Sequence, residues 1–337
     1  MNRLIALLAA LALTGPAGSE GLNAGTLGVF YNLDESSSRE IAQYYAARRA
    51  IPAANVIGIH MGTAGVLDAQ AFSSIRKQAM AQLPDAVQSL ALVWSKPYAA
   101  GCMSITTAFA AGYRPEFCAP GCEATAPSPL FDTDGWLPAD TVGWWPAMLI
   151  PTADIAGARA LIDRGIAADA GNPPGILYLA RTADKARNVR AASYQDIEST
   201  IGARLRIVEL SAPVTSEVPR AIGYFTGASQ VEELERIQFL PGAVADHLTS
   251  AGGVLYGGNQ MSALEWLKQG ATAAYGTVSE PCNHLEKFPS INVLMHHYLH
   301  GETILEAYWK SVAMPGQGLF IGEPLSAPFR VRRASAR

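Results

Sequence analysis

The segment DHLTS places four reactive side chains, Asp246, His247, Thr249 and Ser250, within five positions before a glycine pair. A hydroxyl nucleophile, a histidine base and a carboxylate that orients the base would form a hydrolase site. In a helix, however, the adjacent Asp246 and His247 diverge, which argues against a complete triad within one turn. The end of a polar helix, with Thr and Ser bonding local backbone, would have the same composition. His247 and Ser250 are therefore candidate catalytic residues, and Asp246 and Thr249 candidate ligand contacts.

A second group of reactive side chains lies in SEPCNHLEKFP, which follows a strongly apolar predicted strand. Cys282 and His284 could form a thiolate–imidazolium pair, so both are candidate catalytic residues. Glu280 and Lys287 are candidate ligand contacts. Glu, Cys and His could also bind a transition metal. A disulfide at Cys282 and a turn at Pro281 are the alternatives.

Two further motifs resemble metal sites but lack the remaining ligands. His296 and His300 are four residues apart in HHYLH, without the HExxH pattern of a zinc enzyme. Cys118 and Cys122 have metal-like spacing, but no neighbouring histidine or further cysteine ligand completes the set. We predict no metal site, and no cofactor can be inferred from the sequence.

The four cysteines are better explained by disulfides. Cys102, Cys118 and Cys122 lie in one Pro- and Gly-rich stretch, whereas Cys282 is distant in sequence. In an oxidising compartment we expect at least one bridge among the first three. The remaining cysteine of that group could pair with Cys282, or both could be free thiols.

The elements that must position these groups alternate between strands and helices. Apolar strand-like runs are expected at 26–32, 55–60, 90–94, 175–180, 205–210, 221–226 and 271–279, and amphipathic helices at 34–51, 69–83, 153–170, 183–201, 263–269 and 291–312. We expect Val244–Leu248 to lie in a short helix. This alternation predicts an α/β fold with a mostly parallel sheet sandwiched by helices, whose sites lie at the carboxyl ends of strands.

Several strings together resemble an uncharacterised family of exported bacterial proteins. They include PYAAGCMSITTAFAAG, GAVADHLTSAGG, GATAAYGTVSEPC, KFPSINVL and GEPLSAPF, and they span nearly the whole chain after its first residues. The family has no established activity, so this resemblance implies export but no reaction.

The second half is also similar to the gingipain and caspase type of cysteine peptidase, in the order GYFTGAS, a loop with a Gly pair, GATAAYGTVSEP, GETILEAYW and GEPL. This resemblance implies a caspase-like core in the second half. It also implies a His-Gly after the strand containing AIGYFTG and a Cys after the next strand. Here the first position reads Gly227-Ala228-Ser229 and the second falls near Thr249-Ser250, so the Cys/His dyad is not carried over.

These observations divide the chain into five parts. They are a signal peptide at 1–19, an N-terminal α/β part at 20–98, a Cys- and Trp-rich excursion at 99–150, a caspase-like α/β core at 151–330 and a tail at 331–337. The net charge of −4 and the lack of a basic run argue against nucleic-acid binding. After removal of the signal peptide, no run is long enough to span a membrane.

Two classes of function remain, and the sequence does not decide whether the protein is an enzyme. The missing dyad favours a binding protein on a peptidase-like scaffold, with an unidentified ligand or protein partner. The alternative is a divergent hydrolase or peptidase that uses the loops at 246–250 and 280–284. In either case the protein should be exported, to the periplasm or the medium.

Export gives the first testable prediction. Arg3 precedes an apolar run from Leu4 to Leu13, and Ala17 and Ser19 suit a cleavage site. We expect intact-mass analysis of protein from the periplasm or medium to show a chain that begins near Glu20. Recovery of the full-length chain in the membrane would contradict this expectation.

Overall fold

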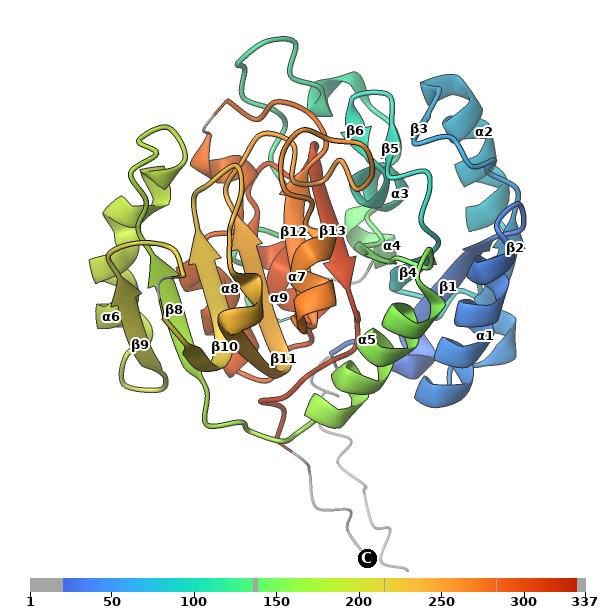
Figure 1. Cartoon of the computed structure of the whole chain (residues 1–337). Helices are drawn as coiled ribbons and strands as arrows, with labels where there is room; N and C mark the ends of the chain where they lie inside the picture. Colours follow the sequence, from blue (N-terminus) through green and yellow to red (C-terminus); the bar gives the residue numbers. More distant parts are fainter. Residues whose placement is uncertain (1–20, 136–138, 215, 283, 332–337) are drawn as a thin grey trace, which may run out of the picture.

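The computed structural model describes residues 21–135, 139–214, 216–282 and 284–331, and the expected signal peptide lies outside these ranges. A ten-stranded sheet runs through the molecule in the order β2-β1-β4-β7-β13-β12-β11-β10-β8-β9 (Figure 1). It includes strands from both halves of the chain. A second, three-stranded sheet has the order β3-β5-β6.

The strands of the large sheet have four to eleven residues, and all but the edge strands β2 and β9 are mostly buried. Their bounds are β1 Leu27–Asn32, β2 Val56–Ile59, β4 Ser89–Val93, β7 Ala147–Ile150, β8 Ile176–Ala180, β9 Arg206–Leu210, β10 Val218–Thr226, β11 Ile237–His247, β12 Ala273–Thr277 and β13 Gly318–Gly322. The small sheet contains β3 Val66–Leu67, β5 Ala99–Ala100 and β6 Met103–Ser104. Parallel pairing joins β2, β1, β4 and β7, and also β12, β11, β10, β8 and β9. β13 runs antiparallel to β12 and pairs with β7 at Ile321 and Leu149.

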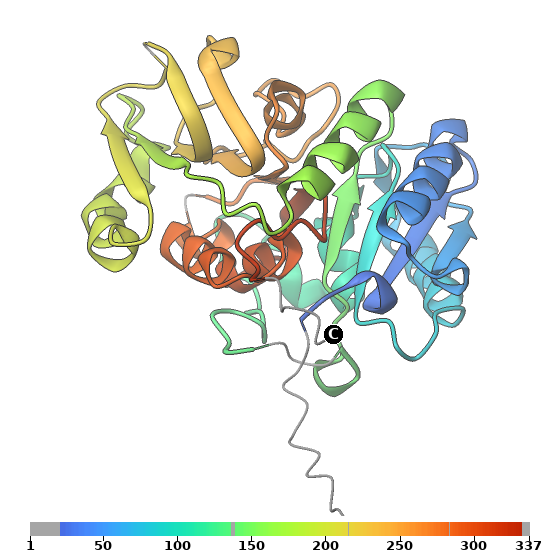
Figure 2. The same ribbon diagram turned by 90° about the horizontal axis from the view of Figure 1, so that it is seen from below.

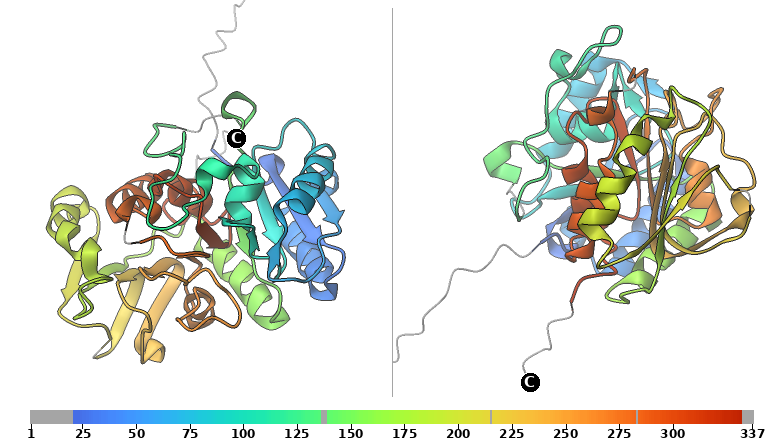
Figure 3. Two further views of the ribbon diagram at one scale, coloured as in Figure 1. Left: turned by 90° about the horizontal axis from the view of Figure 1, so that it is seen from above. Right: turned by 90° about the vertical axis from the view of Figure 1, so that its left-hand side faces the viewer.

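Helices cover both faces of the large sheet, as Figures 2 and 3 show. One face carries α1 Ser36–Arg49, α5 Ile155–Ala168 and α7 Leu264–Gln269. The other carries α2 Ala69–Met80, α3 Ile105–Ala111, α6 Tyr194–Ile201, α8 Ile291–Leu299 and α9 Ile304–Ser311. The short α4 spans Ala139–Val142. The prediction of a mostly parallel sheet sandwiched by helices is therefore confirmed.

The segments that follow several strands meet at one edge of the sheet. After β1 and β4, the Asn32 side-chain amide donates to the carbonyl of Lys96 at 3.2 Å. After β11, the ring of Tyr256 lies beneath the Lys96 ammonium, 5.2 Å from the ring centroid. After β12, the Ser279 hydroxyl donates to the carbonyl of Cys102 at 3.4 Å. We call this the carboxyl edge, and it is where a site was expected.

The prediction of a short helix at Val244–Leu248 is wrong, because β11 runs to His247. Val244, Ala245 and Asp246 pair with β10 on one side and β12 on the other, so this strand is central to its half of the sheet. The small, apolar residues of this run are buried on both faces, as is usual for a central parallel strand. Side chains of neighbouring residues therefore point to opposite faces, not around a helix.

A buried ion-pair cluster connects the first helix to the last strand. Glu323 directly follows β13, and its fully buried carboxylate accepts hydrogen bonds from Arg49 and from the Tyr45 hydroxyl, the latter at 2.6 Å. Arg49 also pairs with Asp169, just after α5. Burial opposes the charged form of Arg49, but the adjacent Glu323 outweighs it and raises the pKa of the guanidinium. The cluster therefore joins α1, α5 and β13.

Removing the charge of Glu323 should destabilise the whole protein. Glu323→Gln leaves Arg49 buried with only the partly exposed Asp169, and we expect a loss of about 3–5 kcal/mol in the free energy of unfolding. The matched control is Glu40→Gln, because Glu40 also joins α1 to α5 through Arg159, but in an exposed pair. This control should cost about 0–1 kcal/mol. Urea denaturation that gives equal losses for the two variants would contradict the prediction.

Candidate functional site

Asp246 and His247, at the end of β11, point to opposite faces of the sheet. The His247 ring contacts Trp266 of α7, with ring centroids 5.8 Å apart. Asp246 instead pairs with Arg190, in the 3-10 turn Asn188–Ser193 that precedes α6. Because successive strand residues alternate between faces, the two side chains cannot act together as base and orienter.

Both ring nitrogens of His247 are occupied by structural hydrogen bonds. The indole N–H of Trp266 donates to Nδ1 at 2.8 Å, so Nδ1 is the acceptor. Nε2 therefore carries the proton and donates to the carbonyl of Met261 at 2.9 Å. The side chain is almost fully buried, and burial lowers the pKa of His247 to about 4. At neutral pH it is a neutral bridge between β11 and the start of α7.

Asp246 forms a buried ion pair that leaves some polar atoms without partners. Oδ1 accepts from Arg190, whose side chain also donates to the carbonyl of Thr226 at 2.9 Å. In the described structure, Oδ2 of Asp246 and two guanidinium nitrogens of Arg190 have no hydrogen-bond partner. Burial raises the pKa of Asp246, and the contact with Arg190 opposes this effect. The pair lies beneath the carboxyl edge, shielded from solvent.

The two hydroxyl residues after β11 differ in their surroundings. The Thr249 hydroxyl is buried, accepts from Nε of Arg187 at 3.0 Å and donates to the amide oxygen of Gln260 at 2.8 Å. Ser250 is half-buried, and its carbonyl accepts from the Thr277 hydroxyl at 3.1 Å. Among the described residues, no histidine nitrogen is hydrogen-bonded to the Ser250 hydroxyl. Ser250 therefore has no histidine base in this arrangement.

The SEPCNHLEKFP loop is attached to the Cys-rich excursion along its length. Cys282 forms a disulfide with Cys122, with Cα atoms 5.1 Å apart. His284 Nε2 donates to the carbonyl of Cys122 at 3.1 Å. The buried Lys287 ammonium donates to the carbonyl of Glu123 at 2.6 Å, and burial lowers its pKa. Glu280 is exposed, and its carboxylate caps the backbone N–H of Cys282 at 2.8 Å.

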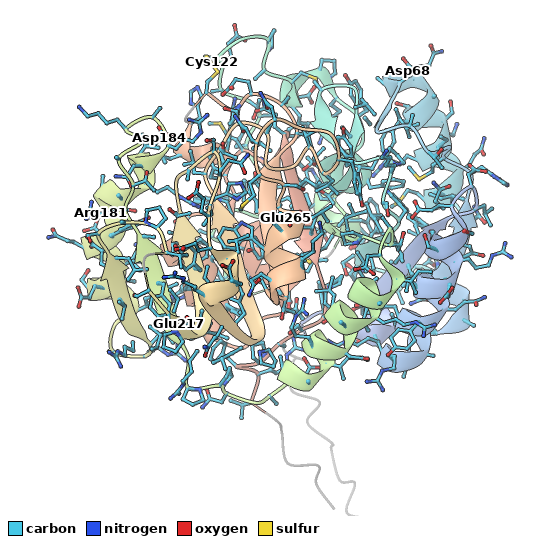
Figure 4. All side chains as sticks on the ribbon, viewed as in Figure 1. Asp68, Cys122, Arg181, Asp184, Glu217 and Glu265 are labelled. Atoms are coloured by element: carbon cyan, nitrogen blue, oxygen red, sulfur yellow. A yellow bond between two sulfur atoms is a disulfide. The ribbon has the colours of Figure 1, made fainter. Side chains whose placement is uncertain are left out.

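A second disulfide joins Cys102 to Cys118, so the expectation of a bridge within the excursion is confirmed. Of the alternatives for the remaining pair, the structure has the long-range bridge from Cys122 to Cys282. All four cysteines are therefore oxidised, and none offers a thiolate. Cys122 lies near the top of the molecule in Figure 4, at the carboxyl edge.

The two predicted loops are neighbours, although their candidate side chains do not converge on one nucleophile. The Thr277 hydroxyl, at the end of β12, bonds the carbonyls of both Thr249 and Ser250, each at 3.1 Å. Gly253 N–H donates back to the carbonyl of Thr277 at 2.9 Å. Within the loops, however, His247 is buried and Cys282 is disulfide-bonded. The backbones meet at the carboxyl edge, and the reactive groups are held apart.

A polar cluster that was not predicted from the sequence lies at the ends of β1, β4 and β7. Glu35 accepts hydrogen bonds from the Ser37 hydroxyl and the Ser95 N–H, both at 3.0 Å, and also from the Thr152 hydroxyl. Each of these residues lies within three residues of a strand end or at the start of α1. Their position near strand ends was the available signal, but β7 lies inside the predicted Cys- and Trp-rich excursion at 99–150, where no strand was expected.

Lys96 and Tyr256 bring the two halves of the carboxyl edge together. The Lys96 ammonium stands over the Tyr256 ring, a cation–π geometry. Burial raises the pKa of the Tyr256 hydroxyl; its hydrogen bond with Ser95 opposes this, and nearby Glu35 adds to it. Lys96 and Glu35 are both half-exposed, so a carboxylate and an ammonium are accessible at this edge.

Within the described ranges, no group of three or more His, Cys, Asp or Glu side chains could hold a metal ion. The same residues include no helix long and apolar enough to span a membrane.

The sheet, its two helical layers and the polar carboxyl edge define a mostly parallel α/β protein. No protein-family model matches the sequence, and no curated protein matches it. Among solved structures, the chain is similar to a complex of the pro- and mature domains of Porphyromonas gingivalis RgpB, with 10% identity, a TM-score of 0.48, and 90% of this chain and 80% of that chain covered. It is also similar to a structure described as a protease, with 11% identity, a TM-score of 0.48, and 91% and 79% coverage.

The buried His247 should make stability depend on pH. Its pKa of about 4 lies below the value of 6.5 expected in the unfolded chain. The unfolded state therefore binds more protons between these values, so stability should fall as the pH is lowered from 6.5 to 4, by up to about 3 kcal/mol. His247→Gln removes the titrating ring, and this variant should lose that part of the pH dependence in urea denaturation. Identical pH profiles for variant and wild type would show that His247 does not contribute.

Proposed function

We propose that this chain is a ligand-binding protein on a peptidase-like scaffold that lacks cysteine–histidine chemistry. The observation that carries the proposal is that the four cysteines form disulfides and that both ring nitrogens of His247 form structural hydrogen bonds. A general base needs an accessible nitrogen and a pKa near the working pH. His247 has neither, because both of its nitrogens are bonded and its pKa is about 4. A thiolate needs a reduced cysteine, and the four cysteines form two disulfides.

The groups that remain accessible suit recognition. Lys96 and Glu35 offer opposite charges where the segments after β1, β4 and β11 meet, and Tyr256 adds an aromatic face. Ligands of parallel α/β sheets bind outside the carboxyl ends of the strands. We therefore assign the ligand contacts of the proposed site to Lys96, Glu35 and Tyr256, beside the loops at 246–250 and 280–284.

The alternative, a divergent hydrolase, would have to use Ser250. A serine hydroxyl needs a base within about 3.2 Å, and no histidine is bonded to this hydroxyl in the described residues. Thr249 is a weaker candidate, since its hydroxyl is already bonded to Arg187 and Gln260. Binding is the simpler proposal for these side chains.

We also propose that the protein works outside the cytoplasm, in an oxidising compartment. The two disulfides support this location, because such bridges are rare where thioredoxin and glutathione keep thiols reduced.

Activity-based labelling separates the two functions. We expect the mature protein to react neither with a fluorophosphonate, which labels activated serines, nor with iodoacetamide in the absence of reductant. After denaturation and reduction, iodoacetamide should label all four cysteines, which is the control for reactivity. We also expect no hydrolysis of Arg-, Lys- or Asp-directed peptide substrates.

Two outcomes would overturn the proposal in different ways. Fluorophosphonate labelling that Ser250→Ala abolishes would establish the hydrolase alternative at the loop after β11. Peptide turnover that Cys282→Ala abolishes would mean that Cys282 acts as a nucleophile after reduction of its bridge to Cys122.

A further inference from the structure

A hollow of about 920 Å³ opens at the edge of the sheet opposite the carboxyl edge. Its wall includes the first residues of β8 and β9 and Arg220, near the start of β10. In Figure 4 Glu217, directly before β10, lies at the lower left, whereas Cys122 of the carboxyl edge lies at the top. The hollow is therefore separate from the site proposed above, and it does not depend on that proposal.

All the charged side chains that line this hollow are arginines. They come from three segments of the chain, with no Asp or Glu among the lining residues: Arg204, Arg206, Arg220 and Arg330. The protein as a whole has a net charge of −4, so the local charge of this hollow is opposite in sign to that of the whole chain. Arginine forms planar, bidentate contacts with phosphate and similar oxyanions, and cations on a concave surface reinforce one another.

Two of the guanidinium groups are held in place by other parts of the protein. Arg204 bonds His300 Nε2 and the carbonyl of Leu299, both at 2.8 Å. Arg330 donates to the carbonyls of Gly301 and Leu22 and lies 3.6 Å from Glu306, which partly neutralises it. Fixed donors lose little conformational entropy when a ligand binds, so these contacts favour binding.

The other two guanidinium groups are exposed and form no ion pair with the described residues. Arg206 has no hydrogen-bond partner there. Burial raises the pKa of the nearby Tyr178 hydroxyl, and the charge of Arg206 opposes this effect. Among the described residues, Arg220 donates only to the carbonyl of Pro174, which also lines the hollow. Both charges are therefore available to a ligand.

Three residues that line the hollow have a left-handed backbone conformation. Ala170, Asn172 and Arg220 all line it and have φ angles of 52°, 42° and 53°, in the left-handed region. Arg220 lies at an irregularity in the pairing of β10 with β11. This conformation is unfavourable for Ala and Arg, and such strain is retained mainly at functional sites.

From these observations we propose that the hollow binds a ligand that carries two or more phosphate or sulfate groups. The arginines contact the oxyanions, and the apolar wall formed by Leu205, Leu299 and Phe329 accommodates the body of the ligand. Two sources share this chemistry, a phosphorylated compound and a sulfated glycan, and binding experiments can distinguish them.

Isothermal titration calorimetry tests the proposal. The mature protein is titrated with pyrophosphate and, separately, with a disulfated heparin disaccharide. We expect at least one probe to bind with a Kd below about 1 mM at low salt, and to weaken in 0.5 M NaCl. The probe that binds more tightly identifies the source. Failure of both probes to bind would overturn the proposal.

A charge reversal in the hollow and a matched control elsewhere show whether the probe binds at this site. Arg206→Glu removes no hydrogen bond to the described residues, so it should fold normally and weaken binding at least tenfold. Arg39→Glu is the matched control, because Arg39 is also exposed and without a hydrogen bond or ion pair there, but lies on α1. An equal loss in both variants would show diffuse attraction to charge and contradict the site.

Arg220→Gly separates function from structure. Glycine adopts φ near 53° without strain, so the melting temperature should be maintained or raised while pyrophosphate or disaccharide binding weakens at least tenfold. A variant that keeps wild-type affinity for the probe would show that Arg220 does not contact the ligand, and would contradict its place in the site.

Discussion

The buried carboxylate of Glu323 links the two halves of this chain where they meet in one sheet. It directly follows β13, the strand between β7 of the first half and β12 of the second. A carboxylate without solvent must be paired, and its partners Arg49 and Tyr45 are on α1, far away in sequence. The pair can form only when α1 and the end of β13 are both in place. Assembly of the complete sheet is therefore coupled to one electrostatic contact, and the carboxyl edge depends on that assembly.

Much of the fold could be predicted because it rests on local patterns. The helix Ile155–Ala168 and the strand Ile176–Ala180 fall within the predicted ranges, since apolar spacing and breakers define both. β7 was missed because its four residues, AMLI, carry no periodicity and lie among Trp, Pro and Gly. The polar end of β11 resembles a helix end in sequence, because Asp246 and His247 are unusual in a buried strand. Each finds a partner there, in Arg190 and Trp266, that the local sequence does not reveal.

The candidate site was less predictable than the fold because its contacts join distant segments. Glu35 is hydrogen-bonded to Ser95 and Thr152, which lie 60 and 117 positions further along the chain. No local sequence pattern predicts such a pairing. A bridge among Cys102, Cys118 and Cys122 could be expected from their proximity in sequence, whereas the choice of pair and the partner of Cys122 could not. SEPCNHLEKFP was correctly expected to follow a strand, whereas DHLTS was expected in a helix and includes the end of β11. Whether their reactive groups were free to react depended on Trp266, Met261 and Cys122, which only the three-dimensional arrangement identifies.

The bridge from Cys122 to Cys282 has a consequence for the biogenesis of the protein. Its cysteines are separated by 160 residues, which take on the order of 10–30 s to synthesise. If the chain enters an oxidising compartment as it is made, Cys102, Cys118 and Cys122 are exposed together before their fourth partner arrives. Three thiols permit three pairings, of which only Cys102–Cys118 is native. A premature bridge to Cys122 would have to be exchanged later, so the yield of correctly folded protein should depend on a disulfide isomerase in the compartment where it folds.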